Sequence, residues 1–313
     1  MSKQKIRTIF MGTPDFAVPG LRRLLSAADF EVIAVYTQPD KPVGRKQILT
    51  PPPVKTIAQA AGITVCQPEK IKTETENIAG LKPDLIVVIA YGKIIPQSIL
   101  DIPAYGCINV HASLLPKYRG AACLNAPILN GDQETGITVM KMEAGLDTGP
   151  ILHQEKIKLN GKETLEELHD CLSQLGAKIL IPVLQDYCHG RIEPKIQNET
   201  EASYVGLVKK EDGKIDPKKT AVEIERQIRA LNPWPGTFLL LPNNEHLKIL
   251  SAQAENGVNN KKIGEIYVKD GRLYLACGQN SLLILKLQRQ NRNALTASDF
   301  LKGNQEIIGL MAA

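Results

Sequence analysis

The chain has 313 residues, 43% of them apolar and 23% charged, with a formal net charge of +5. This length can hold one large or two ordinary domains with a sizeable core, and the composition is typical of soluble globular proteins. The apolar runs are too short to span a bilayer, and the N-terminus has no signal-peptide pattern. We therefore expect a cytoplasmic protein that makes no membrane contact.

The first part of the chain alternates strands with helices. Strands are predicted over residues 6–11, 31–37, 64–66, 84–90, 108–112 and 137–142, and helices over 14–28, 54–61 and 165–190. Thr13 is the expected N-cap of the first helix, and Thr164 with Glu167 forms a capping box for the last. Near-continuous apolar strands separated by helices indicate α/β architecture with a Rossmann-like, doubly wound, mainly parallel sheet. No G-x-G-x-x-G motif follows the first strand, so a dinucleotide cofactor is not indicated.

The rest of the chain differs in kind. Residues 190–208 have little periodicity and are predicted as a linker between a domain at 1–189 and a second domain at 209–313. A helix capped by Thr220 and Glu223 leads into short strands at 237–241, 246–251, 264–268, 272–276 and 282–287. Such closely spaced strands predict a small OB-like β-barrel. We expect the ring of Trp234, which stands between two prolines, to be buried as a packing anchor.

Positive charge is concentrated towards the C-terminal end. Residues 190–313 contain 18 Lys and Arg against 14 Asp and Glu, and no acid occurs between 271 and 298, where Arg272, Lys286, Arg289 and Arg292 lie. A solvated face accounts for this stretch slightly better than a phosphate-contacting surface, although both remain open.

The candidate reactive groups begin with Asn109 and His111. They are two residues apart in a predicted strand, so both side chains face the same side of the sheet. An amide donor beside an imidazole can bind a developing oxyanion and move a proton. Taken alone, such a histidine is more often structural than reactive.

The pair needs an acid as a third group. Asp147 is the best candidate, because it lies in a loop flanked by Gly145 and Gly149 that follows a predicted strand. The glycines allow the backbone to approach closely. A locally bonded aspartate in a turn is an equally ordinary interpretation of this motif on its own.

Several segments together resemble the methionyl-tRNA formyltransferases, a family of folate-dependent enzymes. The matching segments occur in family order over most of the chain: FMGTPDFA (10–17), TQPDKP (37–42), YG (91–92), NVHASLLP (109–116), GLDTG (145–149) and NPWP (232–235). The resemblance implies transfer of a formyl group from 10-formyltetrahydrofolate to the α-amino group of methionine on charged initiator tRNA. It implies a catalytic domain at 1–189 and a tRNA-binding OB-like domain at 209–313.

The resemblance also assigns roles to residues. Asn109, His111 and Asp147 match the family's catalytic group. The co-substrate 10-formyltetrahydrofolate is expected to lie against the residues Ser113, Leu114, Leu115 and Pro116, with Tyr91 near the pteridine. Cys123 stands where the family has another residue, and we interpret its thiol as a small apolar filler.

A basic loop is the predicted grip on tRNA. No acid occurs between positions 41 and 68, whereas Lys41, Arg45, Lys46 and Lys55 are basic. Composition alone does not separate a mobile surface loop from a phosphate-binding one. The resemblance favours tRNA contact, with Arg45 as the main residue and Lys41 and Lys46 beside it.

Three rival functions stay open at this point. A formyltransferase acting on another amine, or a 10-formyltetrahydrofolate hydrolase, would use the same three residues. A non-catalytic RNA-binding protein would not need them. The six cysteines form no C-x-x-C pair and the histidines lack ligand spacing, so no bound metal is expected. The family precedent implies a monomer.

Overall fold

The computed structural model describes residues 4–44, 46–257 and 260–313. The chain divides into two compact units, of which unit 1 comprises residues 1–123, 134–158 and 168–205 and unit 2 comprises 124–133, 159–167 and 206–313. Within the described ranges, no helix is long and apolar enough to cross a membrane.

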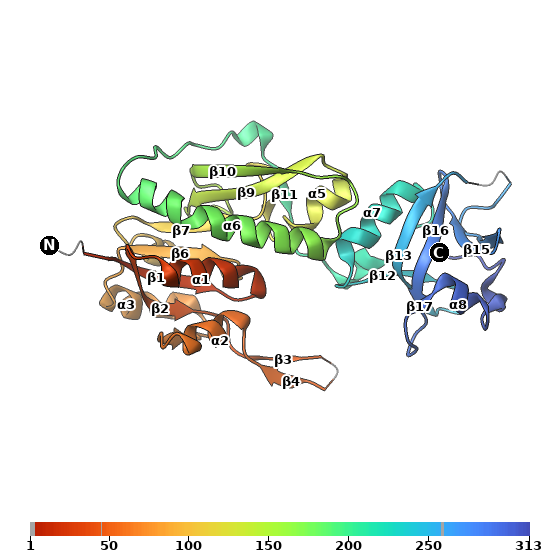
Figure 1. Cartoon of the computed structure of the whole chain (residues 1–313), viewed down its shortest axis with the longest axis horizontal. Coiled ribbons are helices and arrows are strands. Elements are labelled where there is room, and N and C mark those ends of the chain that lie inside the picture. Colours follow the sequence, from red (N-terminus) through yellow and green to blue (C-terminus); the bar gives the residue numbers. More distant parts are fainter. Residues whose placement is uncertain (1–3, 45, 258–259) are drawn as a thin grey trace. The chain divides into compact units, whose positions relative to one another are not determined.

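Unit 1 is built on a seven-stranded mixed sheet of order β10-β9-β7-β6-β1-β2-β5 (Figure 1). Its strands are β1 (Ile6–Gly12), β2 (Phe30–Tyr36), β5 (Val65–Cys66), β6 (Leu85–Ile89), β7 (Cys107–His111), β9 (Glu134–Lys141) and β10 (Ile151–Lys158). The first five in chain order run parallel, whereas β9 is antiparallel to both β7 and β10. The predicted Rossmann-like fold class is confirmed.

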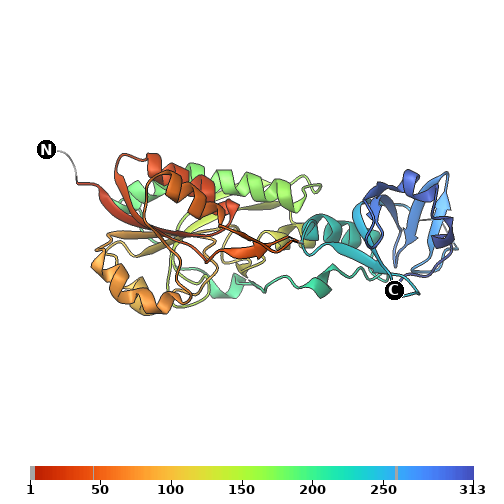
Figure 2. The same ribbon diagram turned by 90° about the horizontal axis from the view of Figure 1, so that it is seen from below.

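Helices cover both faces of this sheet. The helices of unit 1 are α1 (Val18–Ser26), α2 (Pro53–Ala60), α3 (Thr75–Gly80), α4 (Gln97–Leu100) and α6 (Leu165–Cys188), and the short 3-10 turns are η1 (Asp15–Ala17), η2 (Ile71–Glu74) and η3 (Glu199–Glu201). Helices α1 and α6 lie together on one face, and α3 lies on the other (Figure 2). The predicted capping box forms, since Glu167 accepts from the Thr164 backbone while Thr164 accepts from the Glu167 backbone.

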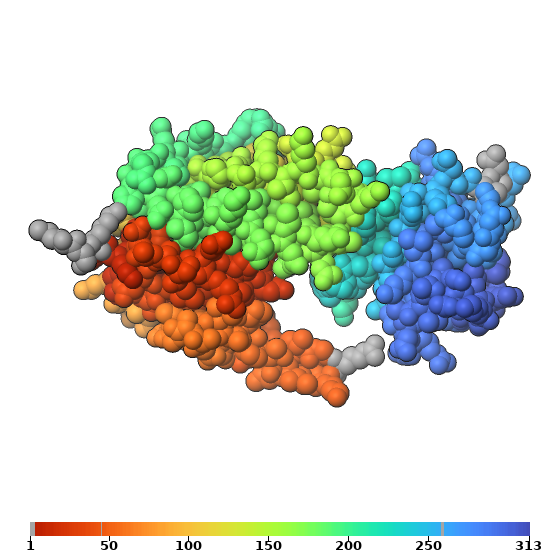
Figure 3. Space-filling view, in the orientation of Figure 1, coloured from red at the N-terminus to blue at the C-terminus, as the bar shows by residue number. Residues whose placement is uncertain are grey.

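Two local predictions about this unit are wrong or incomplete. Thr13 is not an N-cap, because its hydroxyl donates to the Tyr91 carbonyl at 2.9 Å and the chain makes the turn η1 before α1 begins at Val18. Sequence reasoning also missed a hairpin of β3 (Lys41–Val43) and β4 (Ile48–Thr50). This hairpin projects from the body of unit 1 (Figures 1 and 3).

Unit 2 is a β-barrel with its own core. Its sheet runs β12-β13-β16-β15-β14, with β17 paired to β16. The strands are β12 (Thr237–Leu240), β13 (His246–Glu255), β14 (Ile266–Lys269), β15 (Arg272–Ala276), β16 (Ser281–Gln288) and β17 (Leu295–Thr296). All five strands predicted here are present, which supports the OB-like expectation.

A segment at residues 309–313 closes the barrel. On one side the Gly309 and Ala312 amides donate to the carbonyls of Ile266 and Gly264 at 2.7 and 2.8 Å. On the other side Ala313 and Leu240 exchange two backbone hydrogen bonds. The segment therefore joins β14 to β12 and leaves neither as an open sheet edge.

The helices of unit 2 are α5 (Asn125–Asn130), α7 (Ala221–Leu231) and α8 (Ala297–Leu301), with the turns η4 (Lys210–Gly213) and η5 (Gln305–Ile307). The predicted capping box of Thr220 with Glu223 starts α7. The prediction for Trp234 is wrong, because its side chain is 57% exposed. The loop that carries it is held instead by Asn232, whose amide donates to the carbonyls of Ile228 and Ile249.

Some of the positive charges in the acid-free stretch, residues 271–298, are paired with acids from elsewhere in the chain. Arg272 pairs with Glu255, and Arg289 pairs with both Glu245 and Glu306. Two of the four cations in the stretch are thus neutralised by acids from other strands and turns. This pairing favours the solvated-face interpretation for Arg272 and Arg289.

Closure of the barrel predicts a difference between two glycines. Gly264 and Gly271 both have positive φ, +89° and +69°, so alanine is strained at either position. A Cβ at Gly264 would also meet the Ala312 carbonyl at 2.5 Å, whereas a Cβ at Gly271 meets nothing within 4 Å. Gly271→Ala should cost about 1 kcal/mol of unfolding free energy, and Gly264→Ala at least about twice that. Denaturant unfolding measures both, and equal losses would contradict the closure.

Candidate active site

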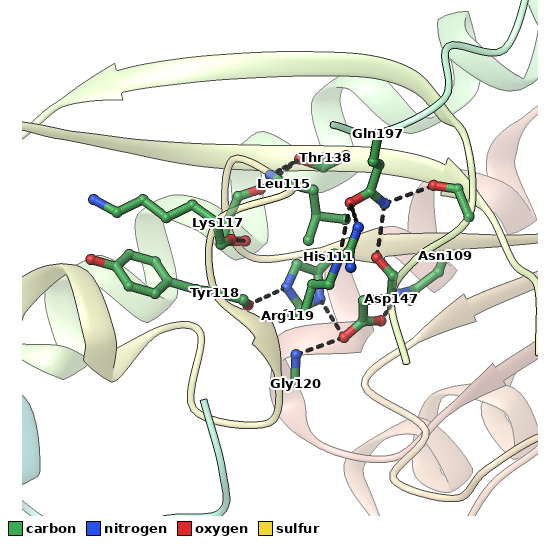
Figure 4. A network of polar contacts seen from close by, with 12 residues as sticks. Asn109, His111, Leu115, Lys117, Tyr118, Arg119, Gly120, Thr138, Asp147 and Gln197 are labelled. Carbon is green, nitrogen blue, oxygen red and sulfur yellow. Dashed lines mark hydrogen bonds and ion pairs between the residues drawn. The ribbon is translucent and has the colours of Figure 1, made fainter. Parts of the chain in front are cut away.

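Strand β7 places Asn109 and His111 on one face of the sheet, as predicted. The intervening Val110 points the other way and lies against Gly176 of α6. Asn109 and His111 are only 9% and 6% exposed, although both are polar. A buried amide and a buried imidazole need partners, which come from the segment after β7 and from a loop beyond β9 (Figure 4).

A backbone carbonyl fixes the ring of His111. Its Nε2 lies 3.0 Å from the Tyr118 carbonyl oxygen, and because a carbonyl only accepts, Nε2 carries the hydrogen. The Nδ1 atom then faces the Asp147 carboxylate, 3.6 Å from Oδ2. Nδ1 is therefore the ring nitrogen available to the site.

Asp147 completes the predicted group. Its Oδ2 accepts a hydrogen bond from the Gly120 amide at 2.8 Å, and its Oδ1 lies 3.5 Å from Nδ2 of Asn109. One carboxylate thus faces both β7 side chains while a peptide N–H anchors it (Figure 4). The structure brings together all three residues that the sequence singled out.

Gly120 is required where it stands. Its φ is +105°, and a Cβ there would collide with the carbonyl oxygen of Val205. The short pair β8 (Arg119–Gly120) and β11 (Tyr204–Val205) brings these two backbones together. A side chain at position 120 would push away β11 and move the N–H that binds Asp147.

The surroundings of His111 favour its charged form. Burial by itself lowers the pKa of the imidazole, but the Cys123 sulfur, the Asp147 carboxylate and the Tyr118 carbonyl outweigh burial and raise the pKa to about 9. His111 is therefore an imidazolium at neutral pH, with Nδ1 protonated. Cys123, which the sequence indicated as a small apolar filler, is buried beside this ring.

A polar network behind Asp147 was missed from the sequence. Gln197 donates to the backbone carbonyls of Asp147 and Gly149 at 2.8 and 2.7 Å, and its Oε1 accepts two hydrogen bonds from Arg119. Arg119 is fully buried and also binds Glu199 and Tyr204. Gln197 lies in the segment predicted as a linker, where its polar neighbours gave it no distinguishing spacing.

The four residues of the predicted folate segment differ in exposure. Ser113 is fully buried and donates to the Lys117 carbonyl, and Leu115 is also buried. The backbone of Leu115 is held by Thr138 and Gln154. Only Leu114 and Pro116 are partly exposed, so these two offer the apolar contact surface of the segment.

The side chain of Tyr91 belongs to the core. It is 1% exposed, and burial raises the pKa of its phenol to about 12. Its backbone carbonyl accepts hydrogen bonds from Thr13 and from the Gln38 amide at 3.0 Å. Any contact of Tyr91 with a ligand is thus made through the backbone of this strand end.

The predicted tRNA-contacting residues lie on or beside the β3–β4 hairpin. Arg45 lies outside the described residues. Lys46 is exposed, and Lys41 is exposed with its ammonium 2.7 Å from the Gln38 side-chain oxygen. Lys55 is paired with Asp40 at 2.8 Å and is not a free cation.

No cluster of three His, Cys, Asp or Glu side chains that could hold a metal occurs among the described residues.

Two family models match the chain, "Formyl transferase" over residues 4–184 and "Formyl transferase, C-terminal domain" over residues 207–305. The chain is 47% identical over 302 residues to the methionyl-tRNA formyltransferase of Citrifermentans bemidjiense, covering 95% of this chain and 93% of that protein. It is 46% identical over 304 residues to the methionyl-tRNA formyltransferase of Geobacter sulfurreducens, with 95% and 94% covered.

Solved structures share the fold at lower identity. An N-formyltransferase of Helicobacter canadensis, solved with folinic acid and dTDP-3-aminofucose, matches with a TM-score of 0.68 and 22% identity over 92% of this chain and 100% of that chain. A sugar 3N-formyltransferase, WlaRD, matches with a TM-score of 0.65 and 21% identity. At these identities the likeness concerns the fold alone.

The pKa of His111 predicts a pH dependence of stability. The folded-state value of about 9 exceeds the ordinary 6.5, so the stabilising contribution of His111 is complete below pH 6.5 and is lost as the pH rises through 9. Wild type should lose on the order of 2 kcal/mol more than His111→Gln between pH 6.5 and 9.5. Denaturant unfolding at both pH values measures this difference, and identical pH dependence in the two proteins would refute it.

Proposed function

The chain belongs to the methionyl-tRNA formyltransferase family, and from this premise we propose that it transfers the formyl group of 10-formyltetrahydrofolate to the α-amino group of methionine on charged initiator tRNA. The observation that carries the proposal is the meeting of Asn109, His111 and Asp147 at 3.5 and 3.6 Å in a chain similar to that family over nearly its whole length. Such a site suits acyl transfer to a neutral amine.

Asn109 and His111 stabilise the oxyanion. When the amine nitrogen attacks the formyl carbon, a C–N bond forms and the carbonyl electron pair moves onto oxygen. The Asn109 amide and the protonated Nδ1 of His111 are the donors on the site side of β7. Because His111 is already cationic at neutral pH, no proton has to be captured before it can act.

Asp147 transfers the amine proton to the leaving group. The amine becomes positively charged on attack, and the Asp147 carboxylate accepts its proton, directly or through water. The proton then passes to the folate nitrogen as the bond from that nitrogen to the formyl carbon breaks. The carbonyl re-forms, tetrahydrofolate leaves, and Asp147 and His111 return to their starting charges.

The remaining parts of the proposal concern binding. The partly exposed Leu114 and Pro116 contact the folate, in keeping with the apolar lining of most small-molecule sites. The catalytic domain predicted at 1–189 also includes residues 190–205 of the predicted linker, which belong to unit 1, and the barrel at 209–313 acts as a tRNA-binding domain. Lys41 and Lys46 on the β3–β4 hairpin, together with Arg45, supply cations to the acceptor stem. The enzyme works as a cytoplasmic monomer without a metal.

Two alternatives use the same three residues. One is a formyltransferase for another amine, such as an aminosugar, and the other is a hydrolase that releases formate. The identity of 46–47% to methionyl-tRNA formyltransferases against 21–22% to sugar formyltransferases favours the tRNA acceptor. The test uses labelled 10-formyltetrahydrofolate with charged initiator, uncharged initiator and charged elongator tRNA. Labelling restricted to charged initiator tRNA is expected, and free formate without tRNA would overturn the proposal in favour of hydrolysis.

Asp147→Asn separates binding from chemistry. The amide keeps the shape of the side chain but cannot take the amine proton, and it removes the negative charge beside His111. We expect turnover to fall at least about a hundredfold, with the folate dissociation constant within about threefold of wild type. Single-turnover formylation and equilibrium folate binding give the two numbers. Near-normal turnover would remove Asp147 from the mechanism.

Lys46→Gln tests the hairpin. Loss of one phosphate contact should raise the KM for tRNA several-fold and reduce the slope of log affinity against log salt by about one, with kcat unchanged. Lys158→Gln is the control, because Lys158 is an exposed lysine on β10, an edge strand of the seven-stranded sheet that is separated in strand order from β2, the strand that precedes the hairpin. If both variants change the salt slope equally, the hairpin has no special contact with tRNA.

A further inference from the structure

We propose that Gln197 is a positioning residue for catalysis, which sets the place of Asp147 between Asn109 and His111; this inference rests on the proposed formyl transfer. Gln197 does not contact the three side chains themselves. It bonds to the backbone carbonyls of Asp147 and Gly149, on the far side of the loop from the carboxylate (Figure 4). It therefore acts through Asp147.

The donors and acceptors around Gln197 allow only one orientation of its side-chain amide. The Arg119 guanidinium has only donors, so it must face the amide oxygen of Gln197, which it does with Nε at 3.1 Å and Nη2 at 2.9 Å. The two loop carbonyls are acceptors, so they must face the amide NH₂. Both hydrogens of that NH₂ are used, at 2.8 and 2.7 Å. Gln197 thus presents two donors to the loop because Arg119 occupies its oxygen.

The loop needs such a restraint. Asp147 has a φ of +53°, in the left-handed region, which aspartate adopts more readily than most residues but which is less favourable than right-handed backbone. Its carboxylate makes one short bond, to the Gly120 amide, and stands at 3.5 and 3.6 Å from its two β7 partners. A displacement of about 1 Å would break this arrangement, and misplacement of that size can lower a rate about a hundredfold.

The base of the network is rigid. Arg119 is fully buried, and an unpaired buried guanidinium is very unfavourable. Glu199 compensates its charge through two hydrogen bonds of 2.8 and 2.6 Å, and the Tyr204 hydroxyl accepts a third. The backbone of Arg119 is also held, because Arg119 pairs with Tyr204 where β8 meets β11. Arg119 is therefore fixed at both its backbone and its side chain.

The discriminating variant is Gln197→Glu. A glutamate keeps the volume and strengthens the bond to Arg119, but it presents a second oxygen to the two loop carbonyls and repels them. Gln227 supplies a control for the two buried donors, because it is 6% exposed against 5% for Gln197 and also donates to two backbone carbonyls, those of Asp212 and Lys214. Gln227→Glu disturbs these bonds between α7 and the segment before it in unit 2, but among the described residues the Gln227 oxygen has no partner that corresponds to Arg119.

We expect Gln197→Glu to lower kcat about a hundredfold while folate binding stays within about threefold, and Gln227→Glu to retain kcat. If both variants lose thermal stability and both retain kcat, Gln197 is merely structural and the inference is overturned. If wild type itself does not formylate charged initiator tRNA, the proposed function fails instead, and the His111 titration below still tests the positioning.

Gln197→Met gives a second measurement that does not require turnover or add a charge. The charged or polar groups facing His111 are Asp147, Cys123 and the Tyr118 carbonyl. Withdrawal of Asp147 alone should lower the pKa of His111, which NMR titration of its ring detects at any level of activity. In a variant that folds, an unchanged His111 titration would overturn the inference, whereas Gln227→Met should leave that titration unchanged.

Discussion

The 2.8 Å hydrogen bond from the Gly120 amide to the Asp147 carboxylate is the contact on which the site depends. It joins a loop that follows β9 to a short strand that follows β7, and so brings an acid to two side chains 38 and 36 positions earlier in the chain. The bond exists only because Gly120 has no Cβ and can lie against β11. Local backbone packing therefore decides where a charged side chain sits.

Electrostatic balance in the site follows from the same geometry. A buried imidazole is ordinarily neutral, yet here a carbonyl binds one nitrogen and a carboxylate faces the other, so the ring holds its proton. The cation is compensated by Asp147, just as the buried Arg119 is compensated by Glu199. Two buried positive charges are each matched by one acid, and Gln197 connects the two pairs without a charge of its own.

Features governed by periodicity or by backbone chemistry could be predicted from the sequence. Alternation along β7 placed Asn109 and His111 on one face, and the glycines around Asp147 indicated a loop able to approach them. Features governed by distant partners could not be predicted. Trp234 is exposed in a loop that Asn232 holds, Thr13 bonds to Tyr91 instead of capping a helix, and the amide of Gln197 is oriented by Arg119. The spacing of those residues along the chain does not indicate these contacts.

The closure of the barrel by residues 309–313 has a consequence for how the protein is made. A ribosome delivers every strand of unit 1 by Val205, so the sheet that carries the site can assemble while synthesis continues. Strands β12 and β14 are delivered well before the segment that joins them, and they remain open edges until it emerges. Unit 2 therefore keeps two open strand edges until residues 309–313 have been made, and wrong strand pairing is possible throughout that interval.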